Sequence, residues 1–222
     1  MMKNPVKNNS FSLKGYSLFV LATILLGILS TVSLLFFTTK ENNRSNRQIL
    51  KKEAKNIEKT VSEAFDYSNK INNYIGKQIA EHGSRDLNFI LKTLRQADKF
   101  QNKNTRLLSW SSFDWVSPNN LQLVNSKIGI RKNPPNMSDR QYCLKSPKKP
   151  WTLQLSHPVL GNPSGSWVIP AGTGIVNDGG KYLGSVVIGF NLPELESMVE
   201  QRLNDPISFI VLDEDMNIIL QS

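Results

Sequence analysis

The stretch SWVIPAGTGIVNDGGKYLGSVVIGF, residues 166–190, decides the fold class of this chain. Residues 166–175 and 182–190 contain Val, Ile and aromatic side chains of the kind that favour β-strands. The sequence Asn177-Asp178-Gly179-Gly180 between them is a strong turn signal, because Gly accepts positive φ and Asn or Asp side chains bond to the nearby backbone. The pattern predicts an antiparallel hairpin of two long strands.

Other segments extend this hairpin into a mixed fold. We predict further strands over residues 107–111, 121–124, 151–160, 207–212 and 218–220. We predict helices over residues 44–81, 84–100 and 192–203, with Ser84 and Asn191 as their caps and an irregular segment over 127–149. Helices combined with antiparallel strands place the chain in the α+β class.

Residues 16–37, YSLFVLATILLGILSTVSLLFF, form an apolar stretch of 22 residues without a charge or a proline. About 20 such residues span a bilayer as a helix, so the stretch predicts a transmembrane helix. A cleaved signal peptide is the competing interpretation, but its apolar core usually has about 7–15 residues. The sequence FFTTK at 36–40 is also a poor cleavage site. The anchor is therefore favoured.

Basic residues beside this stretch predict its orientation. Lys3, Lys7 and Lys14 precede the stretch, and positive charges near a span remain in the cytoplasm. Lys40 and Arg44 follow it and weaken the asymmetry. We expect a single-pass protein of the bacterial plasma membrane with a cytoplasmic N-terminus and a periplasmic, extracytoplasmic main region.

A heptad pattern follows the apolar stretch and continues for fewer than three heptads. Its apolar or small members are Ile57, Val61, Ala64, Ser68, Ile71 and Ile75. Such a seam packs either on its own domain or on a second copy of the chain as a homodimer. So short a repeat does not separate the two interpretations, and both can hold along different parts of the helix.

The composition argues against nucleic-acid binding and against catalysis. The net charge is +9, but Lys and Arg are scattered among acids, which favours a basic surface near anionic lipid. Cys143 is the one cysteine, so no internal disulfide forms, and we interpret it as structural. With only His82 and His157, no metal-ligand spacing and no phosphate loop, we expect no enzyme activity, no metal and no cofactor.

Short motifs outside the apolar stretch point to a family. They are LLSW at 107–110, SDRQY at 138–142, SHPVLG at 156–161, SGSWVIP at 164–170 and GSVVIG at 184–189. Their order and spacing resemble the double Cache family of PAS-like extracytoplasmic sensor domains on bacterial receptors, over roughly residues 44 to 222. The resemblance implies a long helix that leaves the membrane and packs on an antiparallel sheet.

With this resemblance, five parts are expected along the chain. They are a cytoplasmic stub (1–15), a transmembrane helix (16–37), a long membrane-emergent helix (38–83), a membrane-distal sensor module (84–203) and the opening hairpin of a truncated membrane-proximal module (204–222).

The resemblance also implies a ligand pocket beside the D-R-x-Y element. Its candidate ligand-binding residues are Asp139, Arg140, Tyr142, Trp151 and Trp167. An Arg side chain binds a carboxylate through two hydrogen bonds, and aromatic rings provide rigid apolar walls. The alternative is that Asp139 and Arg140 pair with the protein itself and that the aromatic residues belong to the core.

The sequence departs from the family's pattern at three places. Cys143 stands where the family usually has Phe. The amino-acid-binding subgroup carries aspartates at positions that correspond here to Leu160 or Gly161, and to Gly189. Without these acids an ammonium group lacks its partner, which disfavours an amino-acid ligand and favours a carboxylate.

These observations predict the ligand-sensing input region of a bacterial membrane receptor, with a kinase or diguanylate cyclase output that the 222 residues lack. The alternatives are a single-pass membrane-anchored binding module and a non-signalling remnant of a split receptor gene. An anchored hydrolase is less favoured.

Overall fold

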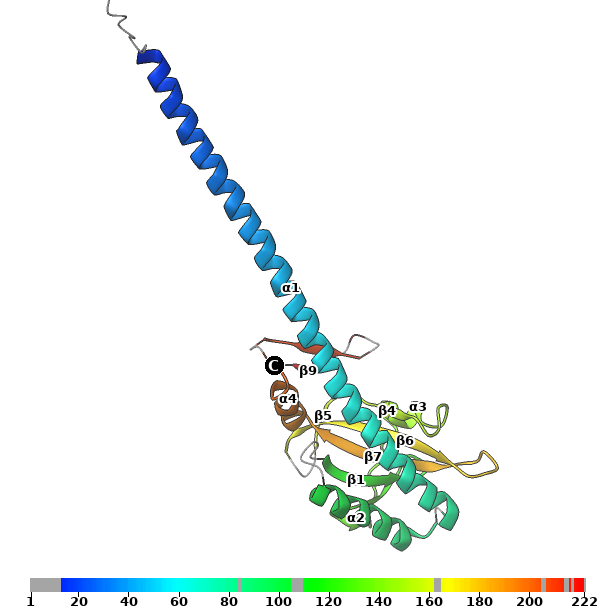
Figure 1. Cartoon of the computed structure of the whole chain (residues 1–222). Helices are drawn as coiled ribbons and strands as arrows, with labels where there is room; N and C mark the ends of the chain where they lie inside the picture. The colour runs from blue at the N-terminus through cyan, green and yellow to red at the C-terminus, as the bar shows by residue number, and fades with distance from the viewer. Residues whose placement is uncertain are drawn as a thin grey trace, which may run out of the picture. The chain divides into compact units, whose positions relative to one another are not determined.

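A computed structural model of the chain describes residues 13–83, 85–104, 110–161, 165–204, 207–213, 216 and 218–221 (Figure 1). Most of the predicted cytoplasmic stub therefore lies outside the described residues, as do Ser84 and residues 107–109 of the first predicted strand. The chain divides into two compact units, one up to Lys52 and one from Glu53 onward. The two units are described separately.

The first unit consists of the N-terminal part of helix α1, whose bounds are Leu13–His82. Side chains are described from Leu25, and those from Leu25 to Lys52 are exposed within this unit. No described helix has a segment that is both long enough and apolar enough to cross a membrane. The side chains of residues 16–24, which open the predicted span, lie outside the described residues.

The second unit contains a seven-stranded antiparallel sheet, which confirms the α+β class. Its strands are β1 (Trp110–Val116), β2 (Gln122–Asn125), β3 (Gly129–Ile130), β4 (Leu153–Leu155), β5 (Val159–Leu160), β6 (Trp167–Val176) and β7 (Tyr182–Asn191). The strand order is β3-β2-β1-β7-β6-β4, and β5 also pairs with β6.

The predicted long hairpin lies at the centre of this sheet as β6 and β7. Ala171 pairs with Ile188 and Thr173 with Val186. Asn177 closes the turn, because its backbone N–H donates to the Lys181 carbonyl (3.0 Å) and its side-chain oxygen accepts from the Lys181 N–H (2.9 Å). The turn between β6 and β7 therefore forms where the sequence predicts it, with the Asn177 side chain bonded to the nearby backbone.

The other helices are α2 (Leu87–Asn104), α3 (Gln141–Lys145) and α4 (Leu192–Glu200). Asp86 caps α2, because its Oδ1 accepts from the backbone N–H groups of Asn88 and Phe89 at 3.0 Å each. Helix α4 begins after Asn191 as predicted, but Asn191 makes no side-chain cap bond and the helix ends three residues early.

Two sequence predictions differ from the structure in the middle of the chain. The segment 127–149, predicted as irregular, contains β3 and α3. The predicted strand 151–160 is two short strands, β4 and β5, with Pro158 between them. Proline has no N–H to donate to a sheet, which is consistent with a break at this point.

The heptad face of α1 packs inside its own unit. Ile57, Val61, Ala64 and Ile75 are at most 8% exposed and belong to one core cluster that includes Phe113 of the sheet. Figure 1 shows this part of α1 lying beside the sheet together with α2. Burial of the seam supports internal packing, and it makes these side chains unavailable for the dimer contact that was the other interpretation.

The C-terminal strands β8 (Ile210–Leu212) and β9 (Ile218–Gln221) form a separate two-stranded sheet. The hairpin joins the same core through Ile219 and Leu220. The segment before the hairpin is tied to α1, because Asn204 Nδ2 donates to Glu53 Oε1 (3.0 Å) and Arg202 pairs with Glu63 (2.8 Å). That the hairpin opens a second module stays a prediction.

Candidate functional site

The two faces of the central sheet have different neighbours, because side chains alternate along a strand. Thr173 and Val186 belong to the face that contacts α1. Gly172 and Val187, one residue away on each strand, belong to the opposite face, where Tyr142 of α3 packs. A Cβ at Gly172 would lie 2.6 Å from Tyr142 Cδ2, so glycine permits this close approach.

A cavity of about 360 Å³ opens on the α3 face of the sheet. Strands β1, β2, β5, β6 and β7 contribute to its walls, together with the segment from Lys127 to Tyr142. Its polar and charged lining residues are Ser112, Asp114, Gln122, Asn125, Lys127, Arg131, Arg140 and Tyr142. Apolar residues such as Val168, Pro170 and Val187 form the remaining wall.

Arg140 lines this cavity from the residue before α3. Its side chain is 30% exposed, and its Nε lies 3.6 Å from Oδ1 of the largely exposed Asp139. An ion pair so exposed contributes little to stability. A guanidinium has five donors, so this contact leaves Arg140 able to bind an anion in the cavity.

Tyr142 lines the same cavity and is 3% exposed. Burial, followed by the neighbouring Cys143, raises the pKa of Tyr142 well above its usual value, so the hydroxyl stays protonated. Burial also raises the pKa of the Cys143 thiol to about 11. A protonated, buried thiol is a poor nucleophile, which supports the structural interpretation of Cys143.

Sequence reasoning missed Asp114, which lines the cavity from β1. Burial raises the pKa of this carboxyl to about 6, against the lowering effect of hydrogen bonds and of Arg131. Asn125 Nδ2 donates to Asp114 Oδ1 at 2.6 Å. The signal was present in the sequence, because Asp114 lies between Phe113 and Trp115, and alternation places it on the face opposite these buried aromatic residues.

Arg131 is the second residue that sequence reasoning missed. It lines the cavity after β3, and its buried Nε has no hydrogen-bond partner among the described residues. A buried donor without a partner costs about 1–3 kcal/mol. Binding of an acceptor would remove this cost.

The remaining predicted site residues do not line the cavity that contains Arg140 and Tyr142. Trp151 packs near Gly76 of α1, on the other face of the sheet, and has a φ of 61°. Trp167, the first residue of β6, is 55% exposed. Leu160, Gly161 and Gly189, where the resemblance placed the subgroup's aspartates, do line the cavity and are not acidic.

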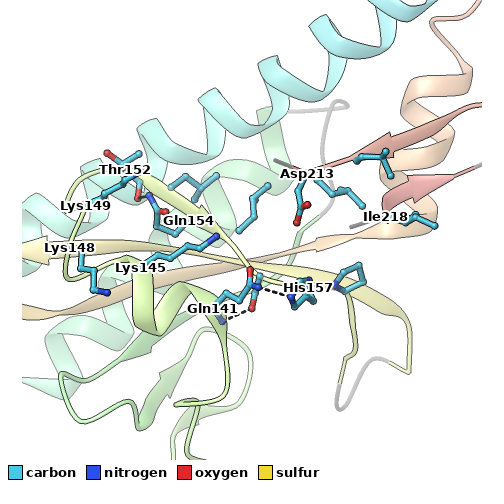
Figure 2. Close-up of a pocket in the computed structure, with 15 residues that line it drawn as sticks. Gln141, Lys145, Lys148, Lys149, Thr152, Gln154, His157, Asp213 and Ile218 are labelled. Atoms are coloured by element: carbon cyan, nitrogen blue, oxygen red, sulfur yellow. Dashed lines mark hydrogen bonds between the residues drawn. The ribbon is translucent and has the colours of Figure 1, made fainter. Parts of the chain in front are cut away.

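A larger cavity of about 630 Å³ lies between α3, β4 and the β8–β9 hairpin. Figure 2 shows lysines 145, 148 and 149 on the α3 side and Asp213 on the hairpin side. The three lysine side chains are exposed. The buried Ser156 accepts a bond from the Gln141 N–H (2.9 Å), and Gln141 also contacts His157. Because its lysines are solvated and these polar groups bond to each other, we favour the smaller cavity as the ligand site.

No group of three His, Cys, Asp or Glu side chains suited to a metal ion occurs in the part of the chain that the structure describes. The charged groups of the smaller cavity are suited instead to holding a small charged molecule.

No protein-family model and no curated protein matches this sequence. Solved structures do match. The sensory domain of the Campylobacter jejuni chemoreceptor Tlp3 with isoleucine bound has a TM-score of 0.59 and 15% identity, over 76% of this chain and 67% of that chain. The chain has the fold of a sensory domain.

Two further sensory proteins share this fold. The V. cholerae histidine kinase DctB sensor domain has a TM-score of 0.55 and 14% identity, over 80% of this chain and 66% of that chain. The ligand-binding domain of the Pseudomonas fluorescens chemoreceptor CtaA, in complex with L-valine, has a TM-score of 0.55 and 12% identity, over 69% of this chain and 64% of that chain. These neighbours are sensor or ligand-binding domains, and they confirm the resemblance to Cache sensors at the level of the fold.

Proposed function

We propose that this chain is the extracytoplasmic ligand-sensing input region of a bacterial membrane receptor, and that the 360 Å³ cavity is its ligand site. The observation that carries the proposal is that Arg140 and Tyr142 line one cavity. The sequence motif singled out the same two residues. The buried Nε of Arg131, which lines this cavity without a partner, supports the proposal independently.

The cavity favours a small molecule with a carboxylate group. Arg131 and Arg140 supply charged donors, which bind a carboxylate more strongly than neutral donors do. Val168, Pro170 and Val187 supply apolar surface for the rest of the ligand. A volume of about 360 Å³ lies within the range of small-molecule sites.

A buried polar contact joins α1 to β6 and β7, the two strands whose opposite face borders the cavity. Asn72 is fully buried, and its Nδ2 donates to Thr173 Oγ1 (3.2 Å) and to the Val186 carbonyl (3.3 Å). On the opposite face, the adjacent Gly172 lies against Tyr142 and Val187 lines the cavity. A ligand that prefers one arrangement of these strands would therefore bias the position of α1.

In this proposal, residues 16–37 anchor the chain in the membrane with the N-terminus in the cytoplasm, and the output domain lies outside the 222 residues. The support for the anchor is the uncharged apolar stretch of 22 residues. A ligand-induced shift in α1 would then be transmitted along the same helix, which runs from Leu13 to His82.

The ligand site is tested by a thermal-shift screen of the full chain in detergent against carboxylates and amines. We expect at least one carboxylate to stabilise the wild type and to lose this effect in Arg140→Ala. Arg85→Ala, which removes an exposed arginine that does not line the cavity, is the matched control and should keep the effect. Equal stabilisation of the wild type and Arg140→Ala would reject this site.

A further inference from the structure

The larger cavity, beside the β8–β9 hairpin, carries an inference that goes beyond the proposed carboxylate site. We propose that this cavity of about 630 Å³ is a second ligand site, and that it binds a phosphate monoester whose organic part is apolar. The two cavities have separate linings, because no residue that lines the cavity of Arg140 also lines this one. A ligand in one cavity therefore does not occupy the other.

The basic wall of the larger cavity comes from the end of α3 and the turn after it. Figure 2 shows lysines 145, 148 and 149 on this side, and all three side chains are exposed. Lys148 and Lys149 form no ion pair with any acidic residue that the structure describes. Asp213 is the one acid among the described residues that line the cavity, so basic groups outnumber acidic ones. This imbalance favours an anionic ligand.

Two buried polar side chains line the same cavity. Ser156 is 8% exposed, and its Oγ accepts a hydrogen bond from the backbone N–H of Gln141 at 2.9 Å. Among the described residues no group accepts a bond from the Ser156 hydroxyl, so its proton is available to a ligand. Gln154 is 9% exposed, and its Nε2 donates to the Thr152 carbonyl over a long 3.4 Å. Neutral donors therefore add to the lysines.

The kind of donor favours a phosphate group over a carboxylate. An Arg guanidinium matches the two oxygens of a carboxylate through paired hydrogen bonds, whereas a Lys ammonium acts as a point charge. A phosphate monoester carries about −1.5 to −2 charges at pH 7 and has three strong acceptor oxygens. The three lysines and the Ser156 hydroxyl supply separate donors for these oxygens. The larger cavity therefore complements a phosphate, while the arginines of the smaller cavity complement a carboxylate.

The hairpin contributes exposed apolar side chains to this cavity. Leu212 of β8 and Ile218 of β9 line it and are 39% and 50% exposed, although the adjacent Ile219 is buried in the core. Leu153 and Leu155 of β4 add half-buried apolar surface. Removal of apolar surface from water is favourable in proportion to its area. An ester with an apolar organic part should therefore bind more tightly than inorganic phosphate.

The test is calorimetric titration of the full chain, in neutral detergent and a phosphate-free buffer, with phenyl phosphate, benzenesulfonate and inorganic phosphate. Benzenesulfonate carries the same ring with a single negative charge. We expect phenyl phosphate to bind the wild type about tenfold more tightly than either comparison compound. In Lys148→Glu combined with Lys149→Glu, this affinity should fall by about tenfold or more. Lys92→Glu combined with Lys99→Glu, at exposed positions of α2 outside the cavity lining, should keep it.

A second pair of variants tests the apolar wall without a change of charge. Ile218→Ser should weaken the binding of phenyl phosphate and leave the binding of inorganic phosphate unchanged. Ile210→Ser is the matched control, because Ile210 is 61% exposed on the same hairpin and does not line the cavity. Since both positions are exposed, this pair decides the inference if the lysine double variant does not fold.

Competition identifies the source of the phosphate. Phosphatidic acid added to the micelles should displace phenyl phosphate if the cavity holds a lipid head group. It should leave phenyl phosphate bound if the cavity takes a soluble phosphate ester. Either result supports a phosphate-monoester site.

Three results would overturn the inference. They are that phenyl phosphate does not bind the wild type, that the lysine double variant binds it as tightly as the wild type, and that a comparison compound binds equally well. Binding that survives in the lysine variant but is lost in Arg140→Ala would place the phosphate in the smaller cavity. The carboxylate site is judged separately, because its test uses carboxylates and Arg140→Ala.

Discussion

At the scale of single residues, Gly172 controls how closely Tyr142 packs on the sheet. A Cβ at this position would lie 2.6 Å from Tyr142 Cδ2 and 2.9 Å from its Cγ. These atoms are close to the backbone of a buried side chain, so they have little freedom to move away. The shape of the cavity wall therefore depends on the absence of a side chain at position 172.

We predict that Gly172→Ala destabilises the protein by about 1–3 kcal/mol, the usual cost of overpacking, and weakens ligand binding by displacing Tyr142. Chemical denaturation measures the first effect and titration the second. Gly179→Ala is the control, because the nearest atom to its Cβ is 3.5 Å away. Equal stability of the two variants would contradict the close packing of Tyr142 against Gly172 of β6.

Asp114 makes a prediction about stability. Its pKa in the folded protein, about 6, is above its ordinary value of 3.8. The folded state therefore binds more protons than the unfolded state between these values, and its stability falls as pH rises from about 4 to about 6. Asp114→Asn removes this contribution.

We therefore expect Asp114→Asn to gain about 1–3 kcal/mol relative to the wild type between pH 4 and pH 7. Urea denaturation of both proteins at several pH values measures the difference between their free energies of unfolding. The titration of the other groups is common to both proteins and cancels in this difference. A difference that does not change with pH would contradict the burial of this carboxyl.

At the scale of elements, α1 presents one buried face to the sheet and one exposed face to solvent. Ile75 is fully buried in the core, and the adjacent Tyr74 is 64% exposed. The heptad spacing predicted the buried face but did not identify what covers it, because a sheet and a second helix both accept the same apolar stripe.

We predict that Ile75→Ala lowers the free energy of unfolding by about 2–5 kcal/mol, the usual cost of deleting a buried Ile side chain. Tyr74→Ala should change it by less than about 1 kcal/mol. Denaturant titration followed by circular dichroism compares the two. Similar losses for both variants would mean that this face of α1 does not pack on the sheet.

Local sequence predicted most elements but less of the site. The hairpin 166–190 was predictable, because its strands and its Asn-Asp-Gly-Gly turn carry local signals. Helix α3 was not predicted, because five residues are too few for a periodic pattern. Arg140 and Tyr142 were found by their motif. Asp114 was missed because the strand predicted over residues 107–111 ends before it, and Arg131 was missed because only the pairing of β2 and β3 brings it to the cavity.

At the scale of the whole molecule, the proposed receptor needs an anchor. We predict that the full chain remains in the membrane pellet after alkaline carbonate extraction. Ile28→Arg combined with Val32→Arg should release it, because a central charge in a span costs about 2.5–3.5 kcal/mol. Leu144→Arg, at an exposed site on α3, should leave the chain in the pellet. Release of the wild type into the soluble fraction would contradict the prediction that residues 16–37 anchor the chain.

The most direct test of the ligand site is a crystal structure of the protein with the tightest-binding hit from the screen. We predict ligand density in the 360 Å³ cavity, with the carboxylate within hydrogen-bond distance of Arg140 and the ring of Tyr142 against the ligand. Density in the 630 Å³ cavity beside the β8–β9 hairpin instead, with the Arg140 cavity empty at saturating ligand, would contradict the account.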